Sequence, residues 1–183
     1  WVIGGFVVGL IAVMVGSFRP HLARIAGPIY ALAEGVVLGA ISRAYSEQYN
    51  GIVLQAVGAT LGVFVAMLVM YRTGIIRVND KFRRVVMSAM VGLLIFYGVS
   101  FLFNLLGANI TFFNDASLLG IGFSIFVAGL AAASLALDFD FIERGEKEGL
   151  PKQMEWFAAL GVVITLVWLY LEILRLLSKL RDN

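Results

Sequence analysis

The stretch GIVLQAVGATLGVFVAMLVMY, residues 51–71, decides the fold class of this chain. It holds no charged residue, and it is long enough to cross the hydrocarbon core of a bilayer, which takes about 20 mostly apolar residues. Its apolar residues run on continuously instead of alternating with polar ones, as they would in a strand of a membrane barrel. The stretch therefore predicts a transmembrane α-helix.

Five further apolar runs of similar length lie along the chain, two before this one and three after it. Short segments with charged residues, proline or asparagine separate them, and such segments are turn signals. The six runs are residues 1–18, 22–42, 51–71, 85–107, 118–137 and 154–177. No segment between them is long enough for a soluble domain. We therefore predict an all-α, polytopic membrane protein with six transmembrane helices, in which residues 1–183 form a single helical-bundle domain in contact with membrane lipid.

The composition excludes several classes of protein. Of the 183 residues, 61% are hydrophobic and only 14% are charged, against about a quarter in an ordinary soluble domain. A soluble enzyme of this length could not bury so much apolar side chain. The chain has no cysteine and one histidine, which excludes thiol catalysis and Cys- or His-rich metal sites. We expect no enzymatic activity, no tightly bound cofactor and no binding to nucleic acid, since the basic residues lie in short connections.

The basic residues are distributed unevenly among these connections. Most of the 14 Lys and Arg residues fall in the first, third and fifth connections between the runs. Cytoplasmic loops of membrane proteins carry an excess of Lys and Arg. This pattern predicts that the odd-numbered connections face the cytoplasm and that Trp1 and Asn183 lie outside.

Acidic residues within the apolar runs are the first candidates for function, because an ionisable side chain inside a bilayer is costly. Glu34 lies in the middle of the second run. For it, a hydrogen bond to a neighbouring helix and a role in proton or cation movement remain equal alternatives. Glu172 lies in the last run, three residues before Arg175, and this spacing predicts an ion pair within the helix.

Two more acids, Asp138 and Asp140, close the fifth run. Two residues apart on one helix, they point in different directions and cannot form a carboxylate pair with each other. We expect Asp138, which follows Leu137, to face the bundle. For Asp140 we expect solvation at the helix end, with Arg144 four residues later as an alternative partner.

The chain resembles the Bax inhibitor family (transmembrane Bax inhibitor motif, or YccA-like), in its bacterial branch. The strings that carry the resemblance are LDFDFIERG at 137–145, EW at 155–156, WLYLEILRLL at 168–177, GIGFS at 120–124 and KFRR at 81–84. The resemblance implies a seven-helix bundle in which the last helix is central, so the family's first helix would precede Trp1. It also implies a multi-pass protein of a bacterial plasma membrane.

The resemblance further implies a pH-sensitive calcium leak channel. In this family two acids, one on each of the last two helices, share a proton, and an arginine can latch onto the first of them. Asp138 matches the first acid, and Arg19 falls nearest the latch. Glu172 or Thr165 matches the second acid, depending on the register. A last helix that begins near Lys152 puts Glu172 about 30 Å along its axis, whereas Thr165 is closer to the level of Asp138.

The predicted mechanism needs only one acid. Protonation of Asp138 would weaken its attraction to Arg19 and shift a closed–open equilibrium. Its charged oxygens would attract the calcium ion, a hard cation that takes oxygen ligands, so Asp138 is the candidate metal contact. Asp140 and Glu34 are candidate helpers in sensing pH or in the ion pathway. A non-catalytic regulator that binds a membrane protease or another membrane complex is the alternative function, because the family analogy allows it.

Overall fold

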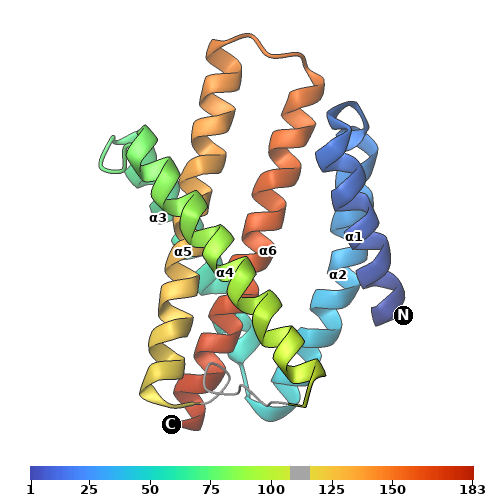
Figure 1. The fold of residues 1–183 in the computed structure, drawn as a ribbon, viewed down its shortest axis with the longest axis vertical. Coiled ribbons are helices and arrows are strands. Elements are labelled where there is room, and N and C mark those ends of the chain that lie inside the picture. Colours follow the sequence, from blue (N-terminus) through green and yellow to red (C-terminus); the bar gives the residue numbers. More distant parts are fainter. Residues whose placement is uncertain (108–115) are drawn as a thin grey trace.

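The computed structural model describes residues 1–107 and 116–183 and contains only helices within them. The elements are α1 (Val2–Phe18), the short 3₁₀ helix η1 (Pro20–Leu22), α2 (Ala23–Gln48), α3 (Ile52–Arg72), α4 (Asp80–Leu105), α5 (Leu118–Lys147) and α6 (Gln153–Asp182). Figure 1 shows them as one elongated bundle. The prediction of an all-α helical bundle is confirmed.

Five of the helices, α2 to α6, are long and apolar enough to cross a membrane. The sixth, α1, is equally apolar but has 17 residues. At 1.5 Å per residue it is about 26 Å long, slightly less than the hydrocarbon thickness of about 30 Å. The chain is therefore an integral, multi-pass membrane protein with five full-length candidate spans and one shorter apolar helix.

Four helices run further than their apolar stretches predict, among them α6, which ends at Asp182 instead of residue 177. α2 continues to Gln48, and α5 continues to Lys147, so the expected loop from residue 138 is wrong for its first half. The reason is that Ala, Glu, Lys and Arg favour a helix even where the apolar run stops. α4 begins at Asp80 instead of residue 85 because the Asn79 side chain caps it, accepting a hydrogen bond from the Phe82 backbone at 2.8 Å. α5 ends just before Gly149. This residue has a φ of 64°, a left-handed conformation that glycine adopts easily and that terminates helices.

The last helix occupies the centre of the bundle. α6 runs antiparallel to α5 and also packs against α1, α2 and α3. On one side α1 and α2 form a hairpin, seen in blue in Figure 1, while α4 crosses the bundle diagonally and packs mainly on α5. The expectation of a central last helix is confirmed.

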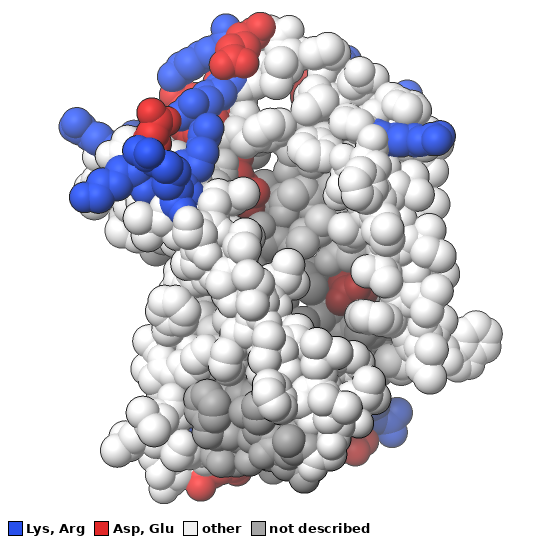
Figure 2. Space-filling view, in the orientation of Figure 1, with Lys and Arg blue, Asp and Glu red and all other residues white. Residues whose placement is uncertain are grey.

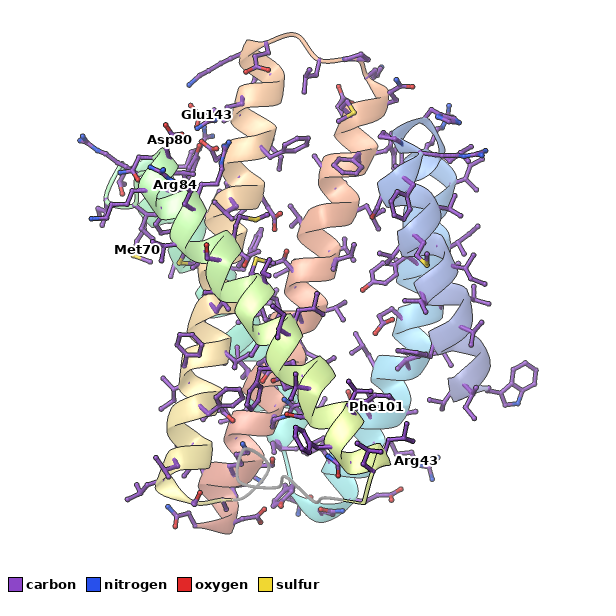
Figure 3. The ribbon with its side chains drawn as sticks, viewed as in Figure 1. Arg43, Met70, Asp80, Arg84, Phe101 and Glu143 are labelled. Carbon is purple, nitrogen blue, oxygen red and sulfur yellow. The ribbon has the colours of Figure 1, made fainter. Side chains whose placement is uncertain are left out.

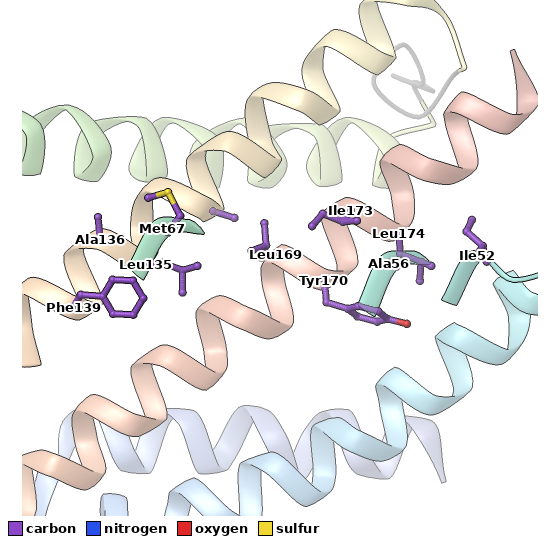
Figure 4. Packing of buried hydrophobic residues seen from close by; sticks show 11 residues of the cluster. Ile52, Ala56, Met67, Leu135, Ala136, Phe139, Leu169, Tyr170, Ile173 and Leu174 are labelled. Atoms are coloured by element: carbon purple, nitrogen blue, oxygen red, sulfur yellow. The ribbon is translucent and has the colours of Figure 1, made fainter. Parts of the chain in front are cut away.

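Three clusters of buried apolar side chains hold these helices together. The largest joins α3, α5 and α6, and Figure 4 shows Leu135 and Phe139 of α5 beside Leu169 of α6. The second lies between α4 and α5, around Val127. The third joins α1, α2 and α6 around Leu160. Because every cluster includes α5 or α6, these two helices position the polar groups described below.

The odd-numbered connections lie at one end of the bundle. Figure 1 shows the α1–α2, α3–α4 and α5–α6 connections toward the upper end and the C-terminus at the lower end. In Figure 2 most of the visible Lys and Arg side chains gather at the upper end. The uneven distribution of basic residues along the chain is therefore also an uneven distribution between the two ends of the molecule.

Candidate functional site

Asp138 lies on α5 and faces α6, in the interior position that the sequence predicts. Its Oδ2 atom is fully enclosed and has no hydrogen-bond partner within the described ranges. A Cβ atom placed on Gly161 of α6 would lie 3.6 Å from Asp138 Oδ1. The absence of a side chain at Gly161 therefore leaves room for the carboxylate.

Thr165 is the second α6 residue at this level. Its side chain interacts with the Asp138 carboxylate, and its Oγ1 lies 3.1 Å from the backbone oxygen of Gly161. A hydroxyl has one proton, which can go to the carbonyl or to the carboxylate but not to both. Of the two registers that the resemblance leaves open, the structure places Thr165 opposite Asp138.

Glu172 belongs to a different cluster. It lies seven residues after Thr165, about 10 Å further along α6, and is 4% exposed. The Nη1 atom of Arg175 donates to both of its oxygens, at 3.2 and 3.3 Å, and lies 3.4 Å from the hydroxyl of Tyr97 on α4. The predicted Glu172–Arg175 ion pair is confirmed. Glu172 does not form a carboxylate pair with Asp138.

Lys179 is a buried cation that sequence reasoning missed. It is 4% exposed, and its Nζ donates to the Gly120 backbone oxygen at 3.0 Å and to Ser124 Oγ at 2.8 Å. Both acceptors lie at the start of α5, in the string GIGFS. The apolar count places Lys179 beyond the sixth run, in solvent. A signal was present, because Lys179 lies seven residues after Glu172 and therefore on the same helical face.

Asp140 is not solvated, so the expectation for this residue is wrong. It is 7% exposed, and its Oδ2 lies 2.7 Å from Arg83 Nη2 and 2.9 Å from Arg144 Nε. The alternative partner, Arg144, is therefore the correct one, and Arg83 of α4 joins it. The physical reason is that α5 continues past Asp140, which brings this residue against the first turns of α4. Asp140 connects α4 to α5 and is paired with two guanidinium groups.

Glu34 lies between α2 and α1. A Cβ atom on Gly9 of α1 would come within 3.3 Å of Glu34 Oε2, so the carboxylate rests against that glycine. Within the described residues it makes no hydrogen bond or ion pair, so the first of the two alternatives for Glu34, a hydrogen bond to a neighbouring helix, is not found there. Figure 2 shows that the visible face is hollowed near its centre, with acidic atoms inside the hollow.

Arg19 does not latch onto Asp138 in this structure. It ends α1, is exposed, and borders a shallow pocket with Met14, Phe18 and Leu22. It makes no ion pair with an acid in the part of the chain that the structure describes. The reason is topological, because Arg19 belongs to the α1–α2 connection whereas Asp138 lies on the face of α5 that α6 covers. The predicted latch is therefore not formed.

A cavity of about 460 Å³ opens at the upper end of the α5–α6 pair. Its walls include Phe141 and Ile142 of α5 and Ala158 of α6, and Glu146 and Glu155 lie among its other lining residues. Asp138 lies about one helical turn below Ile142, and Gly161 about one turn below Ala158. The cavity therefore lies about one helical turn above the level of Asp138, which is not one of its lining residues.

Asp138, the candidate metal contact, does not belong to a cluster of metal-ligating side chains in the described residues. No three His, Asp or Glu side chains converge on one point in residues 1–107 and 116–183. Asp138, the hydroxyl of Thr165 and the backbone oxygen of Gly161 nevertheless place several oxygen atoms in one neighbourhood. Such a set can contact a hard cation in passing, while a lasting calcium cage takes six to eight oxygens.

Comparison with known proteins identifies one family. A family model described as Bax inhibitor 1 like matches residues 1–182, which is nearly the whole chain and agrees with the resemblance seen in the sequence. No curated protein matches the chain, and no solved structure does.

Proposed function

Because this chain belongs to the Bax inhibitor 1 like family, we propose that it is a pH-sensitive leak channel for cations, calcium among them. Protonation of Asp138 controls the flux, and the membrane is the plasma membrane of a bacterium. The chain acts by transport and carries out no catalysis. Calcium is the permeant ion and not a resident cofactor.

One observation carries this proposal: the enclosed Asp138 Oδ2 that lacks a hydrogen-bond partner within the described ranges. Burying a polar or charged oxygen without a partner costs free energy. Acidic side chains inside membrane helices are rare for this reason, and they mark ion or proton pathways. The polar groups at Asp140 and Glu172 differ, because arginines already pair with them.

The proposed mechanism is competition between a proton and a cation for the same carboxylate. Charged Asp138 attracts a cation that enters through the cavity above it, and the oxygens of Thr165 and Gly161 contribute to the contact. Protonated Asp138 is neutral and loses that attraction. Since Arg19 is not paired with Asp138, this mechanism replaces the release of a latch. Contact by few oxygens is weak, which suits an ion that must leave again.

The test is calcium flux into liposomes that contain the purified protein, at pH 6 and at pH 8. We expect several-fold more flux at pH 8, because Asp138 is then charged in a larger fraction of molecules. Asp138→Asn should give low flux at both pH values, since the amide is always neutral. Glu148→Gln is the matched control, because Glu148 is an exposed acid near the cavity that does not line it.

A folded Asp138→Asn protein that keeps the flux and the pH response of the unmodified chain would overturn the proposal. Absence of flux at both pH values from unmodified, folded protein would also overturn it. That second result would favour the alternative, a regulator that binds a membrane protease or another membrane complex. Pull-down from native membranes would then be the next experiment.

A further inference from the structure

The start of α4 and the connection before it carry cationic side chains whose charges are not neutralised inside the protein. We call Arg77, Lys81 and Arg84 the α4 basic patch. Nε of Arg77 donates to the backbone oxygen of Gly74 at 3.3 Å, and Nε of Arg84 donates to that of Asp80 at 3.2 Å. A carbonyl satisfies a donor but carries no net charge. Lys81 forms no ion pair within the described residues.

Two of the three acids near this patch are already paired with other groups. Asp140 is bound by Arg83 and Arg144. Glu143 is bound by Lys147 and accepts a hydrogen bond from the hydroxyl of Tyr71. Figure 3 shows Asp80, Arg84 and Glu143 at the same end of the bundle. Asp80 lies in the first turn of α4, where the helix dipole favours its charge. Asp80 forms no ion pair within the described residues, and its single carboxylate cannot neutralise the three cations of the patch, which keeps a net positive charge.

Exposed apolar side chains border the patch. Ile75, two residues before Arg77, is 72% exposed, and Val85, next to Arg84, is 60% exposed. Further along α4, Val91 and Leu94 are also exposed, because this helix packs mainly against α5. Cations next to exposed apolar surface are typical of the bilayer interface, where apolar side chains meet acyl chains and Lys or Arg meets headgroup phosphates.

We propose that the α4 basic patch binds the headgroup phosphate of an anionic phospholipid such as phosphatidylglycerol. The acyl chains of this lipid lie along the exposed apolar face of α4. The guanidinium groups of Arg77 and Arg84 suit the phosphate because a planar fork of N–H donors matches its oxygens. The apolar border favours a lipid over a soluble phosphate compound. This inference is independent of ion transport, so a result against lipid binding would not contradict the proposed function, and a result against ion flux would not contradict lipid binding.

The experiment is a titration of the detergent-solubilised full chain with dioleoyl phosphatidylglycerol or dioleoyl phosphatidylcholine, followed by native mass spectrometry. The two lipids share their acyl chains and differ in net charge. We expect phosphatidylglycerol to bind about 100-fold more tightly, which corresponds to about fivefold for each of the three cations. The double variant Lys81→Gln, Arg84→Gln should weaken phosphatidylglycerol binding about 30-fold, which corresponds to about fivefold for each cation lost. Binding of phosphatidylcholine should not change.

The matched control is the double variant Arg24→Gln, Lys152→Gln. It removes the same charge at the same end of the bundle, but from exposed residues outside the patch. It should keep the phosphatidylglycerol affinity of the unmodified chain. If the patch double variant does not fold, the single variant Arg77→Gln, in the connection before α4, replaces it. This single variant should weaken phosphatidylglycerol binding about fivefold.

Three results would overturn the proposal. The first is equal affinity of the unmodified chain for the two lipids. The second is an equal loss of affinity in the patch and control variants, because general charge would then explain the binding. The third is displacement of phosphatidylglycerol by millimolar glycerol phosphate, which would show that a soluble phosphate is sufficient. Circular dichroism on each variant confirms that the helices are intact.

Discussion

Asp138 and Asp140 lie two residues apart on α5, and their carboxylates have opposite surroundings. Asp140 is contacted by Arg83 and Arg144. Asp138 meets a glycine and a threonine, and one of its oxygens has no hydrogen-bond partner within the described ranges. A residue paired with two arginines is suited to holding helices together. A residue without such a partner is suited to exchanging a proton or an ion, which is why the functional proposal rests on Asp138.

At this scale the role of Asp140 can be tested by Asp140→Asn. The change removes the charge that two guanidinium groups share between α4 and α5. Both arginines are more than one-third exposed, so water compensates part of the loss. We expect a decrease of about 1–2 kcal/mol in the free energy of unfolding, measured by thermal unfolding in detergent. The control is Glu47→Gln, whose pair with Arg43 is mostly exposed and should change stability by less than about 0.5 kcal/mol. Equal effects of the two variants would contradict this assignment.

At the scale of elements, α1 is held to the bundle by glycines. A Cβ on Gly5 would lie 2.9 Å from the backbone oxygen of Ala33 on α2, and one on Gly16 would lie 2.6 Å from Leu160 Cδ2 on α6. The chain has 20 glycines, and at most of those in the described helices a Cβ would meet nothing within 4 Å. Close packing of α1 therefore depends on a few glycines and not on glycine content as such.

Gly5→Ala and Gly4→Ala form a matched pair that tests this packing. The Cβ added at Gly5 meets a backbone oxygen, which cannot move without displacing α2. The Cβ added at Gly4 meets nothing within 4 Å. We expect Gly5→Ala to lower the free energy of unfolding by about 1–3 kcal/mol. Gly4→Ala should be neutral or stabilising by up to about 1 kcal/mol, because alanine favours a helix. Thermal unfolding in detergent measures both, and equal midpoints for the two variants would show that α1 does not pack on α2 in this way.

At the scale of the whole molecule, the two ends of the bundle differ. The upper end carries most of the basic side chains, the α4 basic patch and the cavity above Asp138. The lower end is closed by contacts between segments far apart in sequence. There the hydroxyl of Tyr49, in the α2–α3 connection, lies 2.6 Å from each oxygen of Asp182 and donates its one proton to that carboxylate, and Arg181 donates to the Asn50 backbone oxygen at 2.8 Å. These contacts hold the end of the central helix against α2 and α3.

The closure at the lower end can be tested by titration. The hydrogen bond to Asp182 raises the pKa of the Tyr49 hydroxyl above its ordinary value of 10.0. Because the folded pKa is raised, this contact stabilises the fold below pH 10, and the contribution is lost as pH rises through the folded pKa. Asp182→Asn should move the Tyr49 pKa back toward 10. Ultraviolet absorbance of tyrosinate against pH measures this, with Tyr49→Phe to identify the signal. An unchanged pKa in Asp182→Asn would mean that this hydrogen bond does not form.

Sequence alone was sufficient for the fold class, the family, the central place of the last helix and the inward position of Asp138. The fold class follows from the length of the apolar runs, the position of Asp138 from its place after Leu137, and the family from short strings such as LDFDFIERG. The central last helix follows from the family resemblance. The Glu172–Arg175 pair was also predictable, because it lies within one helix.

Tertiary structure alone decided which residues face one another across helices. It placed Thr165 and not Glu172 opposite Asp138, paired Asp140 with Arg83, and separated Arg19 from Asp138. It also buried Lys179 against the first turns of α5. Spacing along a chain determines only the angle at which a side chain leaves its own helix. Whether a partner lies in that direction depends on where each helix ends and on the axial offset between neighbouring helices. Only the packing of the helices determines both.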